Sequence, residues 1–372
     1  LIVEQGITAT HFVPSMLQVF LLNERVEQCQ SLKRVLCSGE ALPYHLQESF
    51  FSRMDADLFN LYGPTESAIE VTFWVCQRDG ELSTVPIGRP IANTQIHVLD
   101  PQLKPVPVGE LGELHIGGVQ VARGYLNLPE LTAEKFIPDP FSDQIGARLY
   151  KSGDLASFLP DGTILYQGRI DHQVKIRGNR VELGEIETTL AEHPVVQESV
   201  VTAYEVSPGD KRLAAYIVPK EEEPQLIIDL RNFLSKKLPE YMIPASYNFL
   251  DQLPLTPSGK VDRKALPQPR RMRPNLSEAY APPRNATETS LALIWETVIG
   301  LDRIGIHDHF LELGGDSIQC IQISSKAFQA GIQVSPNQIL ELQTIANLAE
   351  TAGTISTAVV EQEIITGPVP FT

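Results

Sequence analysis

The sequence predicts mixed α/β and α+β structure followed by a small helical domain, and three observations support this. Residues 1–170 contain apolar, β-rich runs, such as TQIHVLD, GELHIGG and TILYQG, separated by turns rich in Gly and Pro. Residues 171–267 alternate strand-like segments (VKIRGNRVEL, RLAAYIVPK) with helix-like ones (GEIETTLAEH, IIDLRNFLSKKL). Residues 286–352 are helical in pattern, because the run ETSLALIWETVI places Leu291, Ile294, Trp295 and Val298 on one helix face.

Two segments without hydrophobic periodicity separate or follow these parts. Residues 268–285 are rich in Pro, Arg and polar residues, a composition typical of a linker. Residues 353–372 are expected to form a second linker, leading into a following domain. The chain begins in mid-pattern and without Met, so we also expect that sequence upstream of Leu1 is missing.

Composition and charge exclude several classes of function. The 372 residues carry a formal net charge of -16, which argues against nucleic acid as a partner because phosphate binding needs a surplus of Lys and Arg. No run of roughly 18 apolar residues is present, so no membrane-spanning helix is expected, and no signal peptide is recognisable. The four cysteines show no CxxC spacing, which argues against zinc and a disulfide framework and indicates the reducing cytoplasm.

The segment NLYGPTE, from Asn60 to Glu66, combines an aromatic ring, a hydroxyl and a carboxylate around a Gly-Pro turn. These groups suit a nucleotide: Tyr62 could stack on the base and Asn60 could bond its edge. Thr65 could face a phosphate and Glu66 could bind Mg²⁺. The alternative is a Gly-Pro turn that contains a buried tyrosine.

Three further segments carry charged residues suited to the same ligand. Asp154 follows a Gly turn in YKSGDL, where a carboxylate can accept hydrogen bonds from a ribose diol. Arg169 could pair with phosphate or ribose, and Asp171 lies where the composition changes, a position typical of a hinge. Lys260 lies on a Ser-Gly loop and could swing onto a carboxylate and an α-phosphate; a solvated loop lysine is the alternative.

In this order, and together with GELHIGGVQVARGYLNLPELTAEKF and LPEYMIP, these segments resemble the acyl- and aminoacyl-adenylate-forming family over residues 1–267. The resemblance implies ATP-dependent activation of a carboxylate to an acyl-AMP, thioester formation, and rotation of a small lid between the two half-reactions. It implies an adenine site at Gly39, Glu40, Ala41, Asn60 and Tyr62, nucleotide contacts at Thr65, Asp154 (ribose) and Arg169, Mg²⁺ at Glu66, a hinge at Asp171, and a catalytic lysine at Lys260.

One feature of that family is absent from this sequence. The Ser/Thr/Gly-rich phosphate loop lies upstream of every segment matched here. We therefore expect a truncated adenylate-forming large domain (1–170) followed by an α+β lid subdomain (171–267). The chain is not expected to form an adenylate by itself.

The segment DHFLELGGDSI, residues 308–318, runs from a loop into a predicted helix. Gly-Gly permits a sharp turn that leaves Ser317 at the helix N-terminus, where a phosphodiester meets free N–H groups and the positive end of the dipole. The alternative is that Ser317 is an ordinary N-cap. The segment resembles the attachment site of peptidyl carrier proteins, which implies a four-helix-bundle carrier domain (286–352), 4′-phosphopantetheine on Ser317, and a phosphopantetheinyl transferase as partner.

Taken together, the chain resembles a fragment of a nonribosomal peptide synthetase that activates an amino acid and transfers it to the carrier thiol. The resemblance implies an amino-acid pocket at His11, Leu36, Ser38, Leu61, Ile69 and Glu70, with Lys260 holding the substrate carboxylate. The pattern is similar to that of serine-activating domains, except that Glu70 stands where Asp is usual. A histidine facing a carboxylate in a small apolar pocket suits a short hydroxyl side chain.

The neighbours in such an assembly line can also be predicted. Asp316, directly before Ser317, resembles carriers that serve epimerization domains, and residues 366–372 resemble the start of a domain of the condensation/epimerization superfamily. The alternative is that Asp316 only stabilises the helix N-terminus. For the whole chain, a stand-alone acyl-CoA ligase and a catalytically incomplete carrier or scaffold remain as alternative functions.

Overall fold

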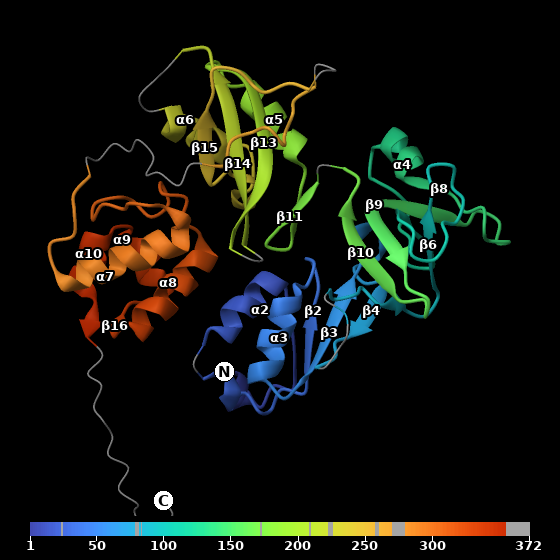
Figure 1. Ribbon diagram of the computed structural model, residues 1–372, viewed down its shortest axis with the longest axis horizontal. Helices are drawn as coiled ribbons and strands as arrows, with labels where there is room; N and C mark the ends of the chain where they lie inside the picture. The colour runs from blue at the N-terminus through green and yellow to red at the C-terminus, as the bar shows by residue number, and fades with distance from the viewer. Residues whose placement is uncertain are drawn as a thin grey trace, which may run out of the picture. The chain divides into compact units, whose positions relative to one another are not determined.

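The computed structural model describes residues 1–23, 25–78, 82, 84–171, 173–207, 210–221, 226–256, 260–269 and 280–354. The chain forms two compact units, Leu1–Arg270 and Arg271–Thr372 (Figure 1). Most of the predicted first linker and of the predicted C-terminal linker, residues 270–279 and 355–372, lie outside the described residues.

A five-stranded sheet of order β1-β2-β3-β4-β5 opens the first unit. Strands β1 to β3 are parallel, and β4 and β5 add antiparallel. Helices α2 and α3 connect the parallel strands, as parallel pairing requires, and lie beside each other (Figure 1). The elements are α1 (Ile2–Gln5), β1 (Ala9–Phe12), α2 (Pro14–Leu21), η1 (Val26–Gln28), β2 (Arg34–Cys37), α3 (Tyr44–Arg53), β3 (Asp57–Tyr62), η2 (Thr65–Ser67), β4 (Thr72–Val75) and β5 (Arg89–Pro90).

The next part of the first unit is an antiparallel sheet of order β10-β9-β7-β6, with β8 paired to β9. Its core contains Leu114, Ile116 and Tyr150, whose side chains are buried. Asp154 on β9 lies directly opposite Arg169 at the end of β10. The elements are β6 (Thr94–Leu99), β7 (Gly112–Gly118), α4 (Pro129–Lys135), β8 (Phe136–Pro138), β9 (Arg148–Phe158) and β10 (Ile164–Arg169).

A short hairpin follows, made of β11 (Val174–Ile176) and β12 (Asn179–Val181). Its two turn residues, Arg177 and Gly178, have φ values of 51° and 80°. Positive φ at both central residues is the geometry of a type I′ turn, whose twist matches that of the strands it joins. The turn sets the register so that Lys175 lies directly opposite Arg180.

The first unit ends in a three-stranded α+β subdomain of order β13-β14-β15 (Figure 1). Strand β14 is buried on both faces, because Leu213 and Ile217 pack with the helices while Ala214 and Tyr216 face a second cluster that includes Leu253. This explains its nearly continuous apolar sequence. The elements are α5 (Leu183–Ala191), β13 (Val196–Ser207), β14 (Asp210–Pro219), α6 (Leu226–Ser235), η3 (Glu240–Met242) and β15 (Ser246–Phe249).

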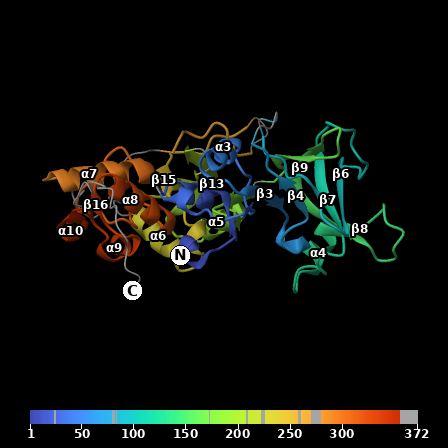
Figure 2. The ribbon, with the colours of Figure 1, turned by 90° about the horizontal axis from the view of Figure 1, so that it is seen from below.

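The second unit is a helical bundle, seen in both views (Figures 1 and 2). The predicted apolar face is confirmed: Leu291, Trp295 and Val298 are buried, and the Trp295 ring packs edge-on against Phe310 with centroids 5.1 Å apart. The elements are α7 (Ala286–Trp295), a short π-helix η4 (Glu296–Gly300), α8 (Ser317–Gln329), β16 (Ile332–Gln333), α9 (Pro336–Leu342), α10 (Ile345–Thr351) and β17 (Gly353–Thr354).

The predicted order of α/β, α+β and helical parts is therefore confirmed. Among the described residues, no helix has the length and apolar character that crossing a membrane requires.

Candidate active site

Three of the residues predicted to bind a nucleotide meet where β3, β9 and β10 come together. The Tyr62 hydroxyl donates to Asp154 Oδ2 at 2.5 Å, and Arg169 Nη1 donates to Asp154 Oδ1 at 2.6 Å. Asp154 is only 4% exposed. Burial raises the pKa of Asp154, and the Arg169 charge and the Tyr62 hydrogen bond oppose that rise. The carboxylate is thus held rigidly by two partners, of which Arg169 lines a cavity.

The predicted hinge residue is paired with the same arginine. Arg169 donates to Asp171 twice, from Nε to Oδ1 at 2.7 Å and from Nη2 to Oδ2 at 2.8 Å. Such a two-point contact restricts both side chains. Asp171 lies directly between β10 and the β11–β12 hairpin, which is the position from which a change in backbone angles would move the hairpin.

Glu66, the predicted Mg²⁺ ligand, has different partners in the structure. Arg180 Nη1 lies 2.8 Å from Glu66 Oε1 and 2.9 Å from Oε2, and the Tyr125 hydroxyl donates to Oε1 at 2.6 Å. Burial pushes the pKa of Glu66 up, but the Tyr125 hydrogen bond and the Arg180 charge outweigh it and leave the pKa below its ordinary value. Within the described ranges, no group of three or more His, Cys, Asp or Glu residues could hold a metal ion. In this arrangement, the surroundings of the Glu66 carboxylate do not suit a divalent cation.

The predicted adenine loop, Gly39 to Ala41, contacts the turn of the hairpin. Glu40 Oε1 accepts a hydrogen bond from the Gly178 backbone N–H at 2.9 Å, and its Oε2 accepts one from the Ser15 N–H at 3.2 Å. The approach is close, because a Cβ at Gly178 would lie 2.7 Å from Val13 Cγ1. Glycine is therefore needed at position 178 both for its positive φ and for the lack of space.

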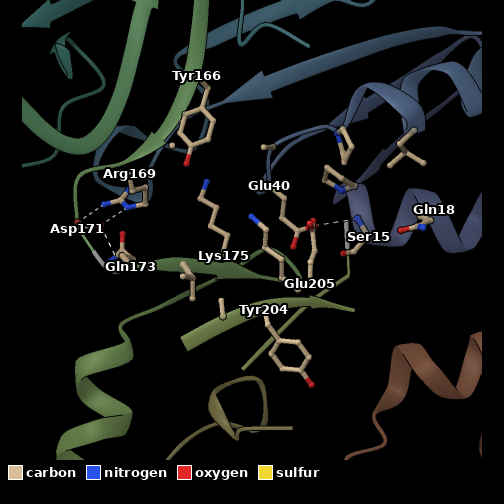
Figure 3. Close-up of a pocket in the computed structure, with 18 residues that line it drawn as sticks. Ser15, Gln18, Glu40, Tyr166, Arg169, Asp171, Gln173, Lys175, Tyr204 and Glu205 are labelled. Carbon is tan, nitrogen blue, oxygen red and sulfur yellow. Dashed lines mark hydrogen bonds and ion pairs between the residues drawn. The ribbon is translucent and has the colours of Figure 1, made fainter. Parts of the chain in front are cut away.

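A cavity of about 690 Å³ is lined by Glu40, Arg169 and Asp171, among other residues. Figure 3 shows Lys175 between the Arg169–Asp171 pair and Glu40. Burial lowers the pKa of Lys175, and the charge of Asp154 opposes that shift. The lining residues that carry polar side chains are Ser15, Gln18, Glu40, Tyr166, Arg169, Asp171, Gln173, Lys175, Tyr204, Glu205 and Lys211.

Two other residues predicted to bind the nucleotide, Asn60 and Thr65, do not line the cavity. Asn60 is buried on β3, and its Nδ2 donates to the Pro86 carbonyl at 2.7 Å, so one of its two amide hydrogens is already used. Thr65 is exposed at the start of η2. Ala41 lines the cavity.

Lys260, predicted to reach the nucleotide, does not line this cavity. Its side chain is exposed, and its backbone forms hydrogen bonds with Thr256 on the same loop. Residues 257–259 of that loop are outside the described part of the chain. On the hairpin, Lys175 lines the cavity and Arg180 contacts Glu66. Sequence reasoning missed both, although their spacing about an Arg-Gly turn was a readable signal that they share one hairpin face.

Two residues of the predicted amino-acid pocket are joined by a hydrogen bond. His11 on β1 and Ser38, which follows β2, lie with His11 Nε2 2.8 Å from Ser38 Oγ. Leu36 lies opposite His11 in the β1–β2 register, and Leu61 is buried on β3. The pairing follows from the parallel strands, which bring their carboxyl ends to one edge of the sheet.

The other two predicted pocket residues, Ile69 and Glu70, lie in a strained turn. Ala68 and Ile69 have φ values of 55° and 78°, and the Glu70 N–H donates to the Ala68 carbonyl at 3.0 Å, as in a γ-turn. Positive φ is unfavourable for a β-branched residue. The Ile69 side chain is 66% exposed.

Ser317 is the first residue of α8, as the sequence predicts for an attachment site. The alternative interpretation, in which Ser317 is the N-cap, is wrong. Asp316 is the cap, and its Oδ1 accepts hydrogen bonds from the N–H groups of Ile318 and Gln319 at 2.9 and 3.0 Å. The preceding glycine is sterically required, since a Cβ at Gly315 would lie 2.5 Å from the Phe310 ring.

Comparison with known families agrees with this division of the chain. Residues 1–126 match the AMP-binding enzyme family, residues 185–260 match the AMP-binding enzyme C-terminal domain, and residues 290–352 match the phosphopantetheine attachment site family. The fold and site thus define an adenylate-forming protein linked to a carrier domain.

Individual relatives make the assignment more specific. The chain is 46% identical over 352 residues to tyrocidine synthase 3 of Brevibacillus parabrevis, covering 94% of this chain and 5% of that protein. It is 50% identical over 332 residues to the phosphinothricin tripeptide synthetase PhsB of Streptomyces viridochromogenes, covering 88% of this chain and 28% of that protein. The chain belongs to the nonribosomal peptide synthetase family, and it spans a small part of the length of these relatives.

Solved structures show the same fold. The structure of holo-PA1221, an NRPS protein containing adenylation and PCP domains, matches with a TM-score of 0.77 at 24% identity, over 94% of this chain and 58% of that one. NpsA-ThdA, an artificially fused adenylation-PCP di-domain from Klebsiella oxytoca, matches with a TM-score of 0.58 at 30% identity, over 66% and 48%.

Proposed function

We propose that this chain is part of a synthetase module that activates an amino acid with ATP and loads it onto its own carrier domain. In the first step, a carboxylate oxygen of the amino acid attacks the α-phosphorus of ATP and pyrophosphate leaves. In the second, the phosphopantetheine thiol attacks the acyl carbon of the aminoacyl-AMP and AMP leaves. The observation that carries this proposal is the joint presence of the Tyr62–Asp154–Arg169 cluster and of Ser317 at the start of α8.

We assign parts of this reaction to the regions predicted from the sequence. Residues 1–170 supply the adenylation core, residues 171–267 the lid, and residues 286–352 the carrier. Asp154 can accept a hydrogen bond from a ribose hydroxyl, since carboxylate oxygens accept more than one. The positive charge of Arg169 offsets the negative charge of the nucleotide. Its guanidinium also holds Asp171, the proposed hinge. Lys260 acts after the lid has carried its loop to the substrate, because its side chain is exposed and does not line the cavity in the present arrangement.

The carrier assignment is tested by the mass of the intact protein after incubation with coenzyme A and a phosphopantetheinyl transferase. We expect one pantetheine adduct on the wild type and none on Ser317→Ala. A nearby serine provides the control: Ser335→Ala removes the capping box of α9 but no proposed attachment site, and should still be modified. An adduct that persists on Ser317→Ala would contradict the assignment.

The adenylation assignment is tested by ATP–pyrophosphate exchange in the full-length protein. We expect amino-acid-dependent exchange in the wild type and a large loss in Lys260→Ala. Removing one group that stabilises a transition-state charge costs about 2.7–4 kcal/mol, or 10²–10³-fold in rate. Lys264→Ala, four residues further on, is the control for loss of a positive charge in the same region. Equal exchange rates in both variants would show that Lys260 is a solvated loop residue.

For the substrate, we propose serine. The His11–Ser38 hydrogen bond supports a small polar pocket at the end of β1 and β2, suited to a hydroxyl side chain. Measuring exchange with each of the common amino acids tests this. Preference for an apolar amino acid over serine would refute the choice of substrate and leave the reaction class intact.

For the neighbours, we propose an epimerization domain downstream and a cytoplasmic location. The four cysteines are buried and form no disulfide with one another, which is consistent with a reducing compartment. Since Asp316 caps α8, its charge is explained by the helix, and the epimerization proposal depends mainly on residues 366–372, which are outside the described residues. Chiral analysis of the amino acid released from the loaded protein tests it, and purely L-configured product would refute it.

A further inference from the structure

The β11–β12 hairpin presents two cations on one face. Lys175 and Arg180 are directly opposite each other in the antiparallel register, so their side chains project to the same side. Lys175 interacts electrostatically with Asp154, and Arg180 forms hydrogen bonds with Glu66. The hairpin therefore brings one positive charge to each of the two carboxylates to which the sequence assigns ribose and Mg²⁺.

The Glu66 carboxylate has little capacity to bind further groups in this arrangement. Arg180 contacts both of its oxygens, the Tyr125 hydroxyl donates to one of them, and the Glu66 side chain is only 10% exposed. An ionised carboxylate this poorly hydrated needs a positive partner, because burying an unpaired charge is strongly unfavourable. A divalent cation would supply that charge, and so does Arg180.

We propose that Arg180 takes the place of the divalent cation at Glu66, so that docking of the hairpin and cation binding at this carboxylate exclude each other. The proposal deepens the proposed function and rests on it. A ligand that binds only one of two conformations shifts the population towards it, and the coupling is reciprocal. The cation should therefore favour the undocked hairpin, and the docked hairpin should weaken cation binding.

The test is a titration of the full-length protein with Mn²⁺ alone, followed by electron paramagnetic resonance, in wild type, Arg180→Met and Glu66→Gln. We expect Glu66-dependent binding that is at least about threefold tighter in Arg180→Met than in wild type. Apparent affinity is reduced by the fraction of molecules able to bind, so threefold corresponds to a hairpin docked about two thirds of the time. Arg89→Met is the matched control, since it removes an arginine–carboxylate pair, with Asp161, that is exposed.

A second measurement follows the hairpin itself. Hydrogen exchange of the backbone N–H groups of residues 174–181 should accelerate as Mn²⁺ is added to wild type, while exchange in β13 and β14 stays unchanged and reports an intact lid. Equal Mn²⁺ affinity in wild type and Arg180→Met, or binding that does not depend on Glu66, would overturn the proposal. Failure of the proposed function is recognised separately, because it would abolish pyrophosphate exchange in the wild type.

Discussion

Replacing Gly178 by alanine should separate docking of the hairpin from folding of the lid. The residue has a φ of 80°, and an added Cβ would lie 2.7 Å from Val13 Cγ1, far inside the usual contact distance of 3.5–4.0 Å between carbon atoms. The positive φ belongs to the turn and penalises alanine by about 1–2 kcal/mol whether or not the hairpin is docked. The contact with Val13 exists only when it is docked.

The magnitude follows from that difference. Forcing an extra methyl group into a packed contact costs typically about 1–3 kcal/mol. Docking in Gly178→Ala should therefore be weakened by about 5- to 150-fold, beyond the backbone penalty of the turn. Because the Gly178 N–H donates to Glu40, loss of docking should also remove the protection of that N–H from exchange with solvent.

The assay is hydrogen exchange of residues 174–181 in the full-length protein, combined with the rates of adenylation and of thioester transfer. Gly162→Ala is the matched control: its φ is 84°, in the turn between β9 and β10, and nothing lies within 4 Å of the added Cβ. Because Lys260, the proposed adenylation lysine, does not line the cavity when the hairpin is docked, we expect docking to serve thioester transfer. Exchange at the hairpin should therefore be faster and thioester transfer slower in Gly178→Ala only, with adenylation unchanged. If the two variants affect hairpin exchange equally, the contact with Val13 does not control docking.

Three further predictions concern stability. Ile69→Asn should raise the free energy of unfolding by about 1 kcal/mol in denaturant titration, because asparagine tolerates the left-handed φ of 78° and the isoleucine side chain is largely exposed; a lower stability would contradict the strain. Trp295→Ala should destabilise the helical unit by about 3–5 kcal/mol by calorimetry, whereas Leu293→Ala on the exposed side of the same helix should change it little. The hydrogen bond from Arg284 holds the pKa of Glu288 below its ordinary value of 4.5. Its stabilisation is therefore present above pH 4.5 and lost as the pH falls through the lowered pKa, so Glu288→Gln should flatten the acid limb of the thermal unfolding profile of the helical unit.

The local features of this protein were readable from its sequence because they depend on neighbours in the chain. The apolar face around Leu291 and Trp295 follows from helical periodicity. The turn before α8 follows from Gly314, whose φ is 91°, and from Gly315, where a side chain would meet Phe310. Periodicity likewise separated the α/β, α+β and helical parts. Such patterns can be read from the sequence alone, because they depend only on the geometry of one helix, strand or turn.

The identity of the partners at the site was decided only by the tertiary structure. Arg180 and Glu66 are 114 residues apart, and no spacing rule connects them. Lys260 and the hairpin both belong to the part of the chain after Asp171. The position of that part determines which cation lies at the cavity. At the carrier helix the same reason operates on a smaller scale: Asp316 and Ser317 are both good capping residues, and the backbone path out of the Gly-Gly turn selects Asp316. Pairings of this kind depend on how separate elements pack, which the local sequence does not encode.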